Sequence, residues 1–162
     1  MTNVDRYSRW FQYEKDSHAQ VVASLRNVPA ELRTQPAFQK AVDLLAHMAA
    51  ARRLWLFRLG GLSEPVTDIF PTGVDLDETA RKLEEIEAVW ERYLLLLRDS
   101  DLAEYFKYQS LEGPRFRNTI EDILAQLFGH SWYHRGQIAA LVRSLGCEPA
   151  VTDLIFWTRE PV

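Results

Sequence analysis

Two histidines, His130 and His134, are the residues of this sequence whose type and spacing best suit chemistry. Side chains four residues apart on an α-helix lie one turn above the other, so two imidazoles with this spacing can bind one metal ion. A buried imidazole needs a partner, because an unsatisfied polar group in an apolar interior costs about 1–3 kcal/mol. Both histidines face inward with the apolar residues that recur at helical spacing around them: Ile120, Leu124, Leu127, Ile138, Leu141 and Leu145.

A third ligand has to come from another part of the chain, which has four histidines in all. His18 and His47 are the two that remain, and both lie in segments with helical spacing of apolar residues. We choose His47 as the third ligand. Three neutral imidazoles leave a coordination position open for water or a substrate, as in catalytic zinc sites, whereas structural zinc sites usually have four protein ligands with cysteines among them. Cys147 is the only cysteine, which excludes a structural site of that kind.

Two further polar residues, Glu14 and His18, interrupt the apolar face expected for the first helix. A purely structural helix would carry leucine at such positions. One interpretation is a buried Glu–His hydrogen bond or a wet gap between helices. The other places both side chains in the pocket of the metal, where they would support a ligand or contact a substrate.

The elements that must position these residues are four helices joined by unequal connections. Apolar spacing predicts helices over residues 5–25, 37–59 and 75–98, and a fourth that follows residue 118 and ends at Gly146. The irregular segment after Gly60 is long enough to be a crossover that lets the second and third helices run parallel. A turn at Gly113 indicates a short hairpin-like excursion before the last helix. We therefore expect an all-α fold, a four-helix bundle with a long crossover connection, as a single domain over residues 1–162.

Several side chains are expected on the outside of this bundle. Glu84, Glu85, Glu87 and Glu91 are interpreted as a solvated face of the third helix. Tyr133 and Arg135 are expected to turn away from the apolar stripe of the fourth helix, where they would make dimer or tail contacts. The apolar residues 154–157 are expected to pack back on the bundle.

Composition restricts the class of protein further. A net charge of −4 argues against a nucleic-acid partner, which would favour a basic surface. The first residues are too charged for a signal peptide, and no apolar run is long enough for a membrane span, so we expect a soluble cytoplasmic protein. Neither the Glu-x-x-His pairs of di-iron carboxylate bundles nor the Gly-x-Ser-x-Gly motif of serine hydrolases occurs.

The run from His130 to Ile138, HSWYHRGQI, resembles the signature H-x-x-x-H-R-G-Q-I of the DinB-like (damage-inducible) proteins. A downstream glycine, proline and aspartate complete that signature, and here they are Gly146, Pro149 and Asp153. The resemblance spans essentially the whole chain. It also covers these positions: Tyr7 and Trp10, His47 with Trp55 and Gly60 on the second helix, and the turn at Gly113.

This resemblance implies a four-helix bundle, often a homodimer, that carries a divalent metal on His47, His130 and His134. Relatives in the wider superfamily include S-transferases and isomerases that use low-molecular-weight thiols. We therefore expect an enzyme whose metal, zinc or nickel, activates such a thiol or a water for reaction with a small-molecule substrate, with thiol transfer favoured over hydrolysis. The alternative is a stress-response module that binds a metal or small ligand without turnover. The aromatic first helix and Trp132 are candidates for the dimer surface.

Overall fold

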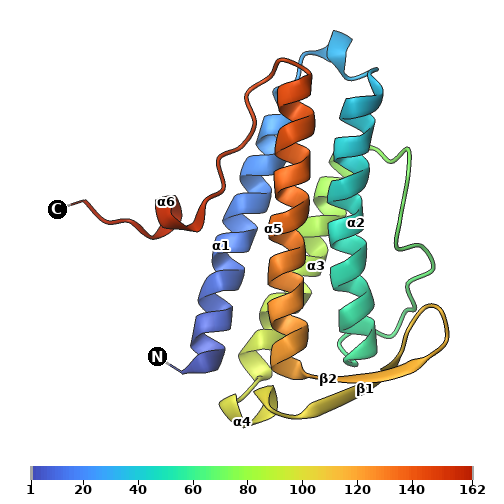
Figure 1. Cartoon of the computed structure of the whole chain (residues 1–162), viewed down its shortest axis with the longest axis vertical. Coiled ribbons are helices and arrows are strands. Elements are labelled where there is room, and N and C mark those ends of the chain that lie inside the picture. The colour runs from blue at the N-terminus through green and yellow to red at the C-terminus, as the bar shows by residue number, and fades with distance from the viewer. Residues whose placement is uncertain (1, 162) are drawn as a thin grey trace.

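The computed structural model describes residues 2–161, and four long helices with a β-hairpin across one end make up its architecture (Figure 1). The long helices are α1 (Asn3–Arg26), α2 (Pro36–Arg58), α3 (Leu76–Leu96) and α5 (Ile120–Ser144). The short elements are η1 (Ala30–Leu32), α4 (Asp99–Leu102), β1 (Tyr105–Gln109), β2 (Arg115–Thr119) and α6 (Leu154–Thr158). The predicted helical bundle and the hairpin before its last helix are confirmed.

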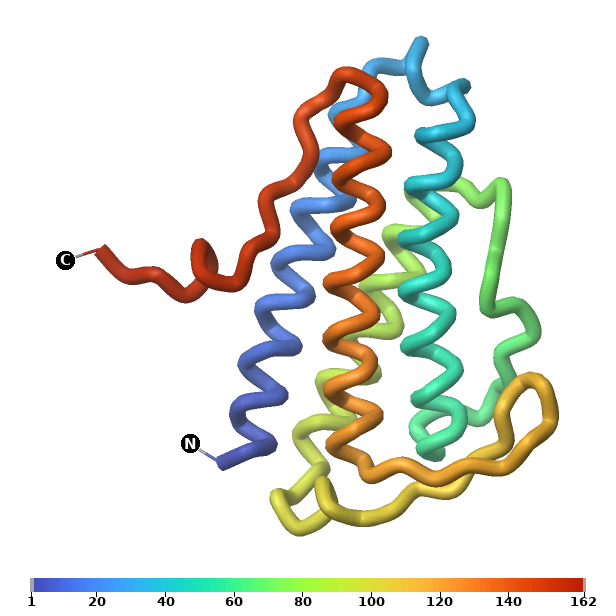
Figure 2. Tube along the Cα trace, viewed as in Figure 1, coloured from blue at the N-terminus to red at the C-terminus, as the bar shows by residue number. Residues whose placement is uncertain are grey.

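The long connection between α2 and α3 determines how the helices run. It leaves α2 at the hairpin end of the bundle and climbs along the outside of that helix, so α3 runs in the same direction as α2 (Figure 2). The expected parallel pair is therefore present. Both α3 and α5 pack against α1 and α2. Because α5 is antiparallel to α2, a residue near the middle of one helix faces a residue near the middle of the other (Figure 1).

Local sequence signals fix where the helices begin and end. The Thr119 hydroxyl accepts a hydrogen bond from the Asp122 amide at 3.0 Å, and the Asp122 carboxylate accepts one from the Thr119 amide at 3.1 Å. This capping box satisfies two amides at the start of α5. Thr119 also pairs with Tyr105 in the hairpin, so the strand delivers the chain directly into the helix that carries two of the histidines. At the other end of α5, Gly146 has a φ of 75°, a left-handed conformation that suits glycine and terminates the helix.

The core fills the space between the four long helices. Its largest fully buried apolar and aromatic side chains are Tyr13, Leu25, Leu45, Met48, Leu56, Trp90, Ile123 and Ile138. They come from all four long helices, as the apolar spacing predicts. None of the helices in the described part of the chain is long and apolar enough to cross a membrane.

Two charged residues that we expected in solvent are buried. Glu87 is 7% exposed and Arg135 is 2% exposed. Glu87 follows Leu83 by four residues and precedes Trp90 by three, so it shares the buried face of α3. Arg135 is buried because α5 packs against both α1 and α2, which makes its covered face wider than the single apolar stripe that we read from the sequence.

The C-terminal segment packs back on the bundle only in part. The Trp157 indole donates a hydrogen bond of 2.7 Å to Asp16 on α1, and its ring contacts the Tyr13 ring. Ile155 and Phe156 remain exposed, and the chain that follows α6 extends away from the bundle (Figure 1). Leu154 and Trp157 are half-buried, so the expectation is correct in part for these two residues and wrong for Ile155 and Phe156.

Candidate metal centre

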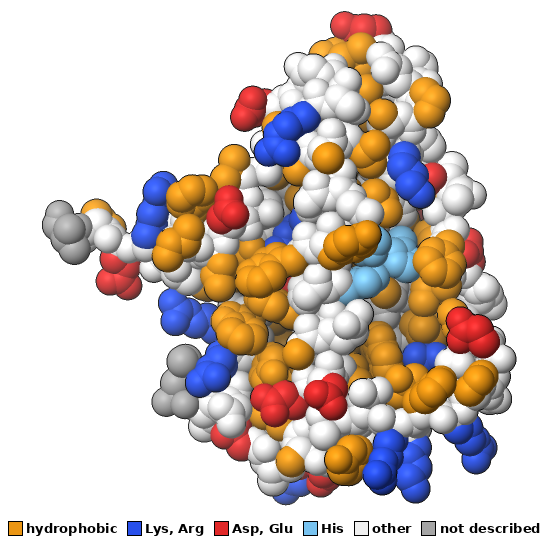
Figure 3. Space-filling view, in the orientation of Figure 1, with side chains coloured by type: hydrophobic (Ala, Val, Ile, Leu, Met, Phe, Trp, Pro, Cys, Tyr) orange, Lys and Arg blue, Asp and Glu red, His pale blue; other side chains and the backbone are white. Residues whose placement is uncertain are grey.

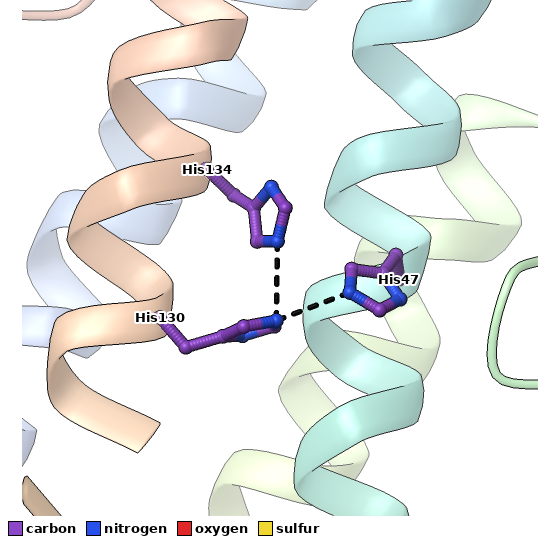
Figure 4. A group of neighbouring side chains, drawn as sticks. All are labelled: His47, His130 and His134. Atoms are coloured by element: carbon purple, nitrogen blue, oxygen red, sulfur yellow. Dashed lines mark hydrogen bonds between the residues drawn. The ribbon is translucent and has the colours of Figure 1, made fainter. Parts of the chain in front are cut away.

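The three histidines chosen from the sequence come together between α2 and α5 (Figure 4). The Nε2 atom of His130 lies 3.1 Å from Nε2 of His47 and 3.1 Å from Nε2 of His134. One ligand atom from each ring lies within 4.8 Å of the other two, so the cluster could hold a metal ion. Two turns of α5 supply one pair of rings, and the facing position on antiparallel α2 supplies the third.

Hydrogen bonds on the outer side of two rings decide where their protons lie. His47 Nδ1 donates to the carbonyl of Ile69 at 2.6 Å, and His134 Nδ1 donates to the amide oxygen of Gln137 at 2.6 Å. A neutral imidazole with its proton on Nδ1 presents a lone pair on Nε2. Both lone pairs point at His130, whose Nε2 carries at most one hydrogen. A cation at the centre would satisfy all three nitrogens, so this donor set fits a metal ion.

The distances also fit a small divalent transition metal. Ligands about 2.0–2.1 Å from a tetrahedral zinc are separated from one another by about 3.3–3.4 Å, and octahedral neighbours at that bond length by about 2.9 Å. The observed separation of 3.1 Å lies between these values. The two pairs that include His130 therefore already have the spacing of metal ligands, and the third pair lies within 4.8 Å.

Burial favours the neutral rings that metal binding requires. It is the main reason that the pKa of His130 is lowered to about 4, and the neighbouring His134 and His47 lower it further. The pKa of His134 is also lowered, again chiefly by burial. At neutral pH both rings therefore carry lone pairs rather than positive charge, and protons compete weakly with a metal.

A groove with a volume of ≈ 580 Å³ opens beside the cluster. Phe70 stacks on His47 with ring centres 4.7 Å apart, and Tyr133 meets the ring of His134 edge-on at 5.1 Å. In the space-filling view the histidines are visible at the surface with hydrophobic side chains on both sides (Figure 3). A small molecule can therefore reach the cluster from solvent. Another cavity of ≈ 580 Å³ lies between α2, α3 and the crossover, but no histidine lines it.

Glu14 and His18 are buried deeper in the bundle and do not line this groove. The two side chains do not bind each other, as one interpretation of the sequence expected; each has another partner. Glu14 accepts a hydrogen bond of 2.5 Å from Arg52, and His18 Nδ1 lies 2.6 Å from a carboxyl oxygen of Glu87. The buried Glu–His pair therefore exists, but its acid comes from α3.

Arg52 links this buried cluster to the helix of the histidines. Its guanidinium donates to the hydroxyl of Ser131 at 3.2 Å, and Ser131 directly follows His130. Arg135, the next residue after His134, donates to the Tyr13 hydroxyl at 2.9 Å and to Thr152 of the C-terminal segment at 3.4 Å. Arg135 thus contacts the tail, as we expected, but from a buried position.

Sequence reasoning missed the groove residues that lie on the crossover. The Ile69 carbonyl and the Phe70 ring both contact His47, but the crossover has no repeating pattern of apolar residues from which these contacts could be predicted. Gln137 could have been found, because it follows His134 by three residues on the same helix face.

Comparisons with known proteins agree with this arrangement. The model of the DinB family matches residues 1–160. The chain is 26% identical over 153 residues to Protein DinB of Bacillus subtilis (strain 168), an alignment that covers 88% of each chain. The crystal structure of a DinB-like protein from Bacillus cereus ATCC 10987 superposes with a TM-score of 0.67 at 19% identity, covering 90% of this chain and 95% of the other. That structural likeness concerns the fold.

Proposed function

Because the chain belongs to the DinB family and brings three imidazoles within reach of one ion, we propose that it is a divalent-metal-dependent enzyme that activates a low-molecular-weight thiol for transfer to an electrophile. One observation carries the proposal: the outer hydrogen bonds of His47 and His134 leave both Nε2 lone pairs directed at the cluster. Zinc or nickel bound there would lower the pKa of a thiol or water at the remaining coordination position and so supply a nucleophile at neutral pH.

The residues around the cluster suit a transfer between organic molecules. Phe70 and Tyr133 flank the histidines on two sides. Leu44 and Leu141 line the groove beyond, where an apolar part of a substrate can be buried. We favour transfer over hydrolysis because this lining offers apolar surface to a second organic reactant.

A metal- or ligand-binding module without turnover is the second candidate. It is favoured by the acceptors around the cluster, which are a backbone carbonyl and a side-chain amide. Among the described residues, no carboxylate makes a hydrogen bond to any of the three rings. The Asp43 carboxylate lines the same groove, but it accepts hydrogen bonds from Gln39 and the Val74 amide, so it is not held at the three rings as a general base would be.

Metal content and turnover test the proposal together. Metal-free protein is reconstituted with zinc, nickel or manganese, and bound metal is measured by mass spectrometry before small thiols are assayed with a chromogenic electrophile. We expect about one metal per chain in the wild type and loss of that metal in His134→Ala. His18→Ala should retain it, because His18 lies outside the cluster. Unchanged metal in His134→Ala would refute the ligand assignment, and tight metal without turnover would favour the module.

We propose separately that the protein is a homodimer. Exposed aromatic and aliphatic side chains lie together where α5 meets the C-terminal segment: Trp132, Val151 and Ile155. A second copy of the chain could cover them, as exposed apolar clusters often mark interfaces. Light scattering after size-exclusion chromatography should give twice the mass of the chain, and a monomer at micromolar concentration would contradict the proposal.

A further inference from the structure

The groove beside the cluster continues along α2 and α5, away from the hairpin. On α2, His47, Leu44 and Lys40 follow at spacings of three and four residues, so they share one face. The seven residues from His47 to Lys40 correspond to about 10 Å along the helix axis. Because α5 runs antiparallel to α2, Leu141 lies farther along the groove than His134, toward Lys40 (Figure 1). The groove therefore has a metal end and a lysine end.

The middle of the groove is apolar. Leu44 of α2 and Ala140 and Leu141 of α5 line it, and Phe70 and Pro71 of the crossover form its outer wall. A short hydrocarbon segment lying there would be removed from water on several sides, which favours binding. Two polar side chains also line the groove: the Gln137 amide, which is bound to His134, and the Asp43 carboxylate, which accepts hydrogen bonds from Gln39 and the Val74 amide.

The lysine end holds a cation without an acidic partner. No carboxylate oxygen of the described chain lies within 4.0 Å of the Lys40 ammonium group. Asp43 is the nearest acid along the helix, but its Oδ1 accepts hydrogen bonds from the Gln39 side chain at 2.9 Å and from the Val74 amide at 3.4 Å.

From this layout we propose that the groove binds an elongated small thiol with a carboxylate at its far end. The thiol lies at the histidine cluster, the apolar middle packs on Leu44 and Leu141, and Lys40 pairs with the carboxylate. The inference rests on the proposed function, because it needs a metal at the cluster to hold the sulfur. It adds the class of thiol and a residue that selects it.

A molecular ruler tests the inference. The first probe is 8-mercaptooctanoic acid, whose extended chain matches the length of the groove. The second, 8-mercapto-1-octanol, has the same chain without the charge, and the third is the short 3-mercaptopropionic acid. Binding to zinc-loaded protein is measured by calorimetry at low salt. The variants are Lys40→Gln, the charge reversal Lys40→Glu, and Lys107→Gln as a matched control on the hairpin, where Lys107 is also exposed.

We expect the wild type and Lys107→Gln to bind the long acid about three- to fivefold more tightly than the alcohol, the range of a good exposed ion pair. Lys40→Gln should abolish this preference, Lys40→Glu should reverse it, and added salt should reduce it. The short acid should be insensitive to Lys40. If zinc binds but the acid and the alcohol bind alike, or neither binds, the inference is wrong while the metal site stands. If the wild type binds no zinc, the proposed function and the inference fail together.

Discussion

Replacing Arg52 should destabilise the protein far more than replacing its neighbour Arg53, although both changes remove an arginine from an ion pair. Arg52 is 3% exposed, and its guanidinium donates to Glu14 at 2.5 Å and to Ser131 at 3.2 Å. Glu14 is itself only 2% exposed, so loss of Arg52 leaves a buried carboxylate without its main partner. Arg53 pairs with Glu64 in solvent.

The expected size follows from these contacts. Removing one partner of a buried ion pair costs about 3–5 kcal/mol, because the remaining charge stays buried and unpaired. We expect the lower end, about 3 kcal/mol, because Arg135 Nη1 remains 3.9 Å from Glu14. For a chain of this length, that loss lowers the melting temperature by roughly 6–12 °C. Arg53→Met should cost less than about 0.5 kcal/mol, as exposed pairs do.

Urea unfolding of the metal-free protein, followed by circular dichroism, provides the measurement. Arg52→Met is compared with Arg53→Met, and with the double variant Glu14→Gln/Arg52→Met, in which the stranded charge is also removed. The double variant should recover about 2 kcal/mol of the loss, because a neutral amide is less costly to bury than a carboxylate. A loss below about 1 kcal/mol in Arg52→Met, or no recovery in the double variant, would refute the reasoning.

Three further predictions concern single side chains. Gln137→Leu should weaken zinc affinity about 10- to 100-fold in a chelator competition, because the amide that orients His134 is lost; unchanged affinity would show that this hydrogen bond does not support the ligand. Burial lowers the pKa of His18 from 6.5 to about 3, so the contribution of His18 to stability is complete above pH 6.5 and falls as the pH drops toward 3. Burial raises the pKa of Glu87 from 4.5 to about 7, so the contribution of Glu87 is complete below pH 4.5 and falls as the pH rises toward 7. Between pH 4.5 and pH 6.5 these two contributions to the free energy of unfolding change in opposite directions. The free energy of unfolding of Glu87→Gln should therefore fall by up to about 1.4 kcal/mol per pH unit more than that of the wild type as the pH falls from 6.5 to 4.5, measured by urea unfolding of the metal-free proteins. Parallel curves for the two proteins would contradict these pKa shifts. Thr119→Ala should cost about 1 kcal/mol of unfolding free energy by loss of the α5 cap, and a change within error would show that the hairpin alone fixes this helix start.

Local signals were enough to predict the helices and the histidine cluster. Apolar spacing and capping residues depend on neighbours within a few positions, and both ends of α5 follow from Thr119 and Gly146. The spacing of His130 and His134 places two rings together on any helix. His47 could be chosen because only one other histidine remained, and the folded chain brings it to the same point.

The sequence by itself thus indicated the bundle and the pair His130 and His134, because both depend on periodicity along single helices, whereas the approach of His47 to this pair depends on the packing of α2 against α5. The tertiary structure decided the partners of the buried charges, since Glu14 meets Arg52 and His18 meets Glu87 only through the register of packed helices. It also decided the walls of the groove, because the crossover that carries Phe70 has no repeating pattern and takes its path from the surfaces on which it lies. Contacts between distant segments follow from how surfaces fit together, and that fit is not encoded in any one segment.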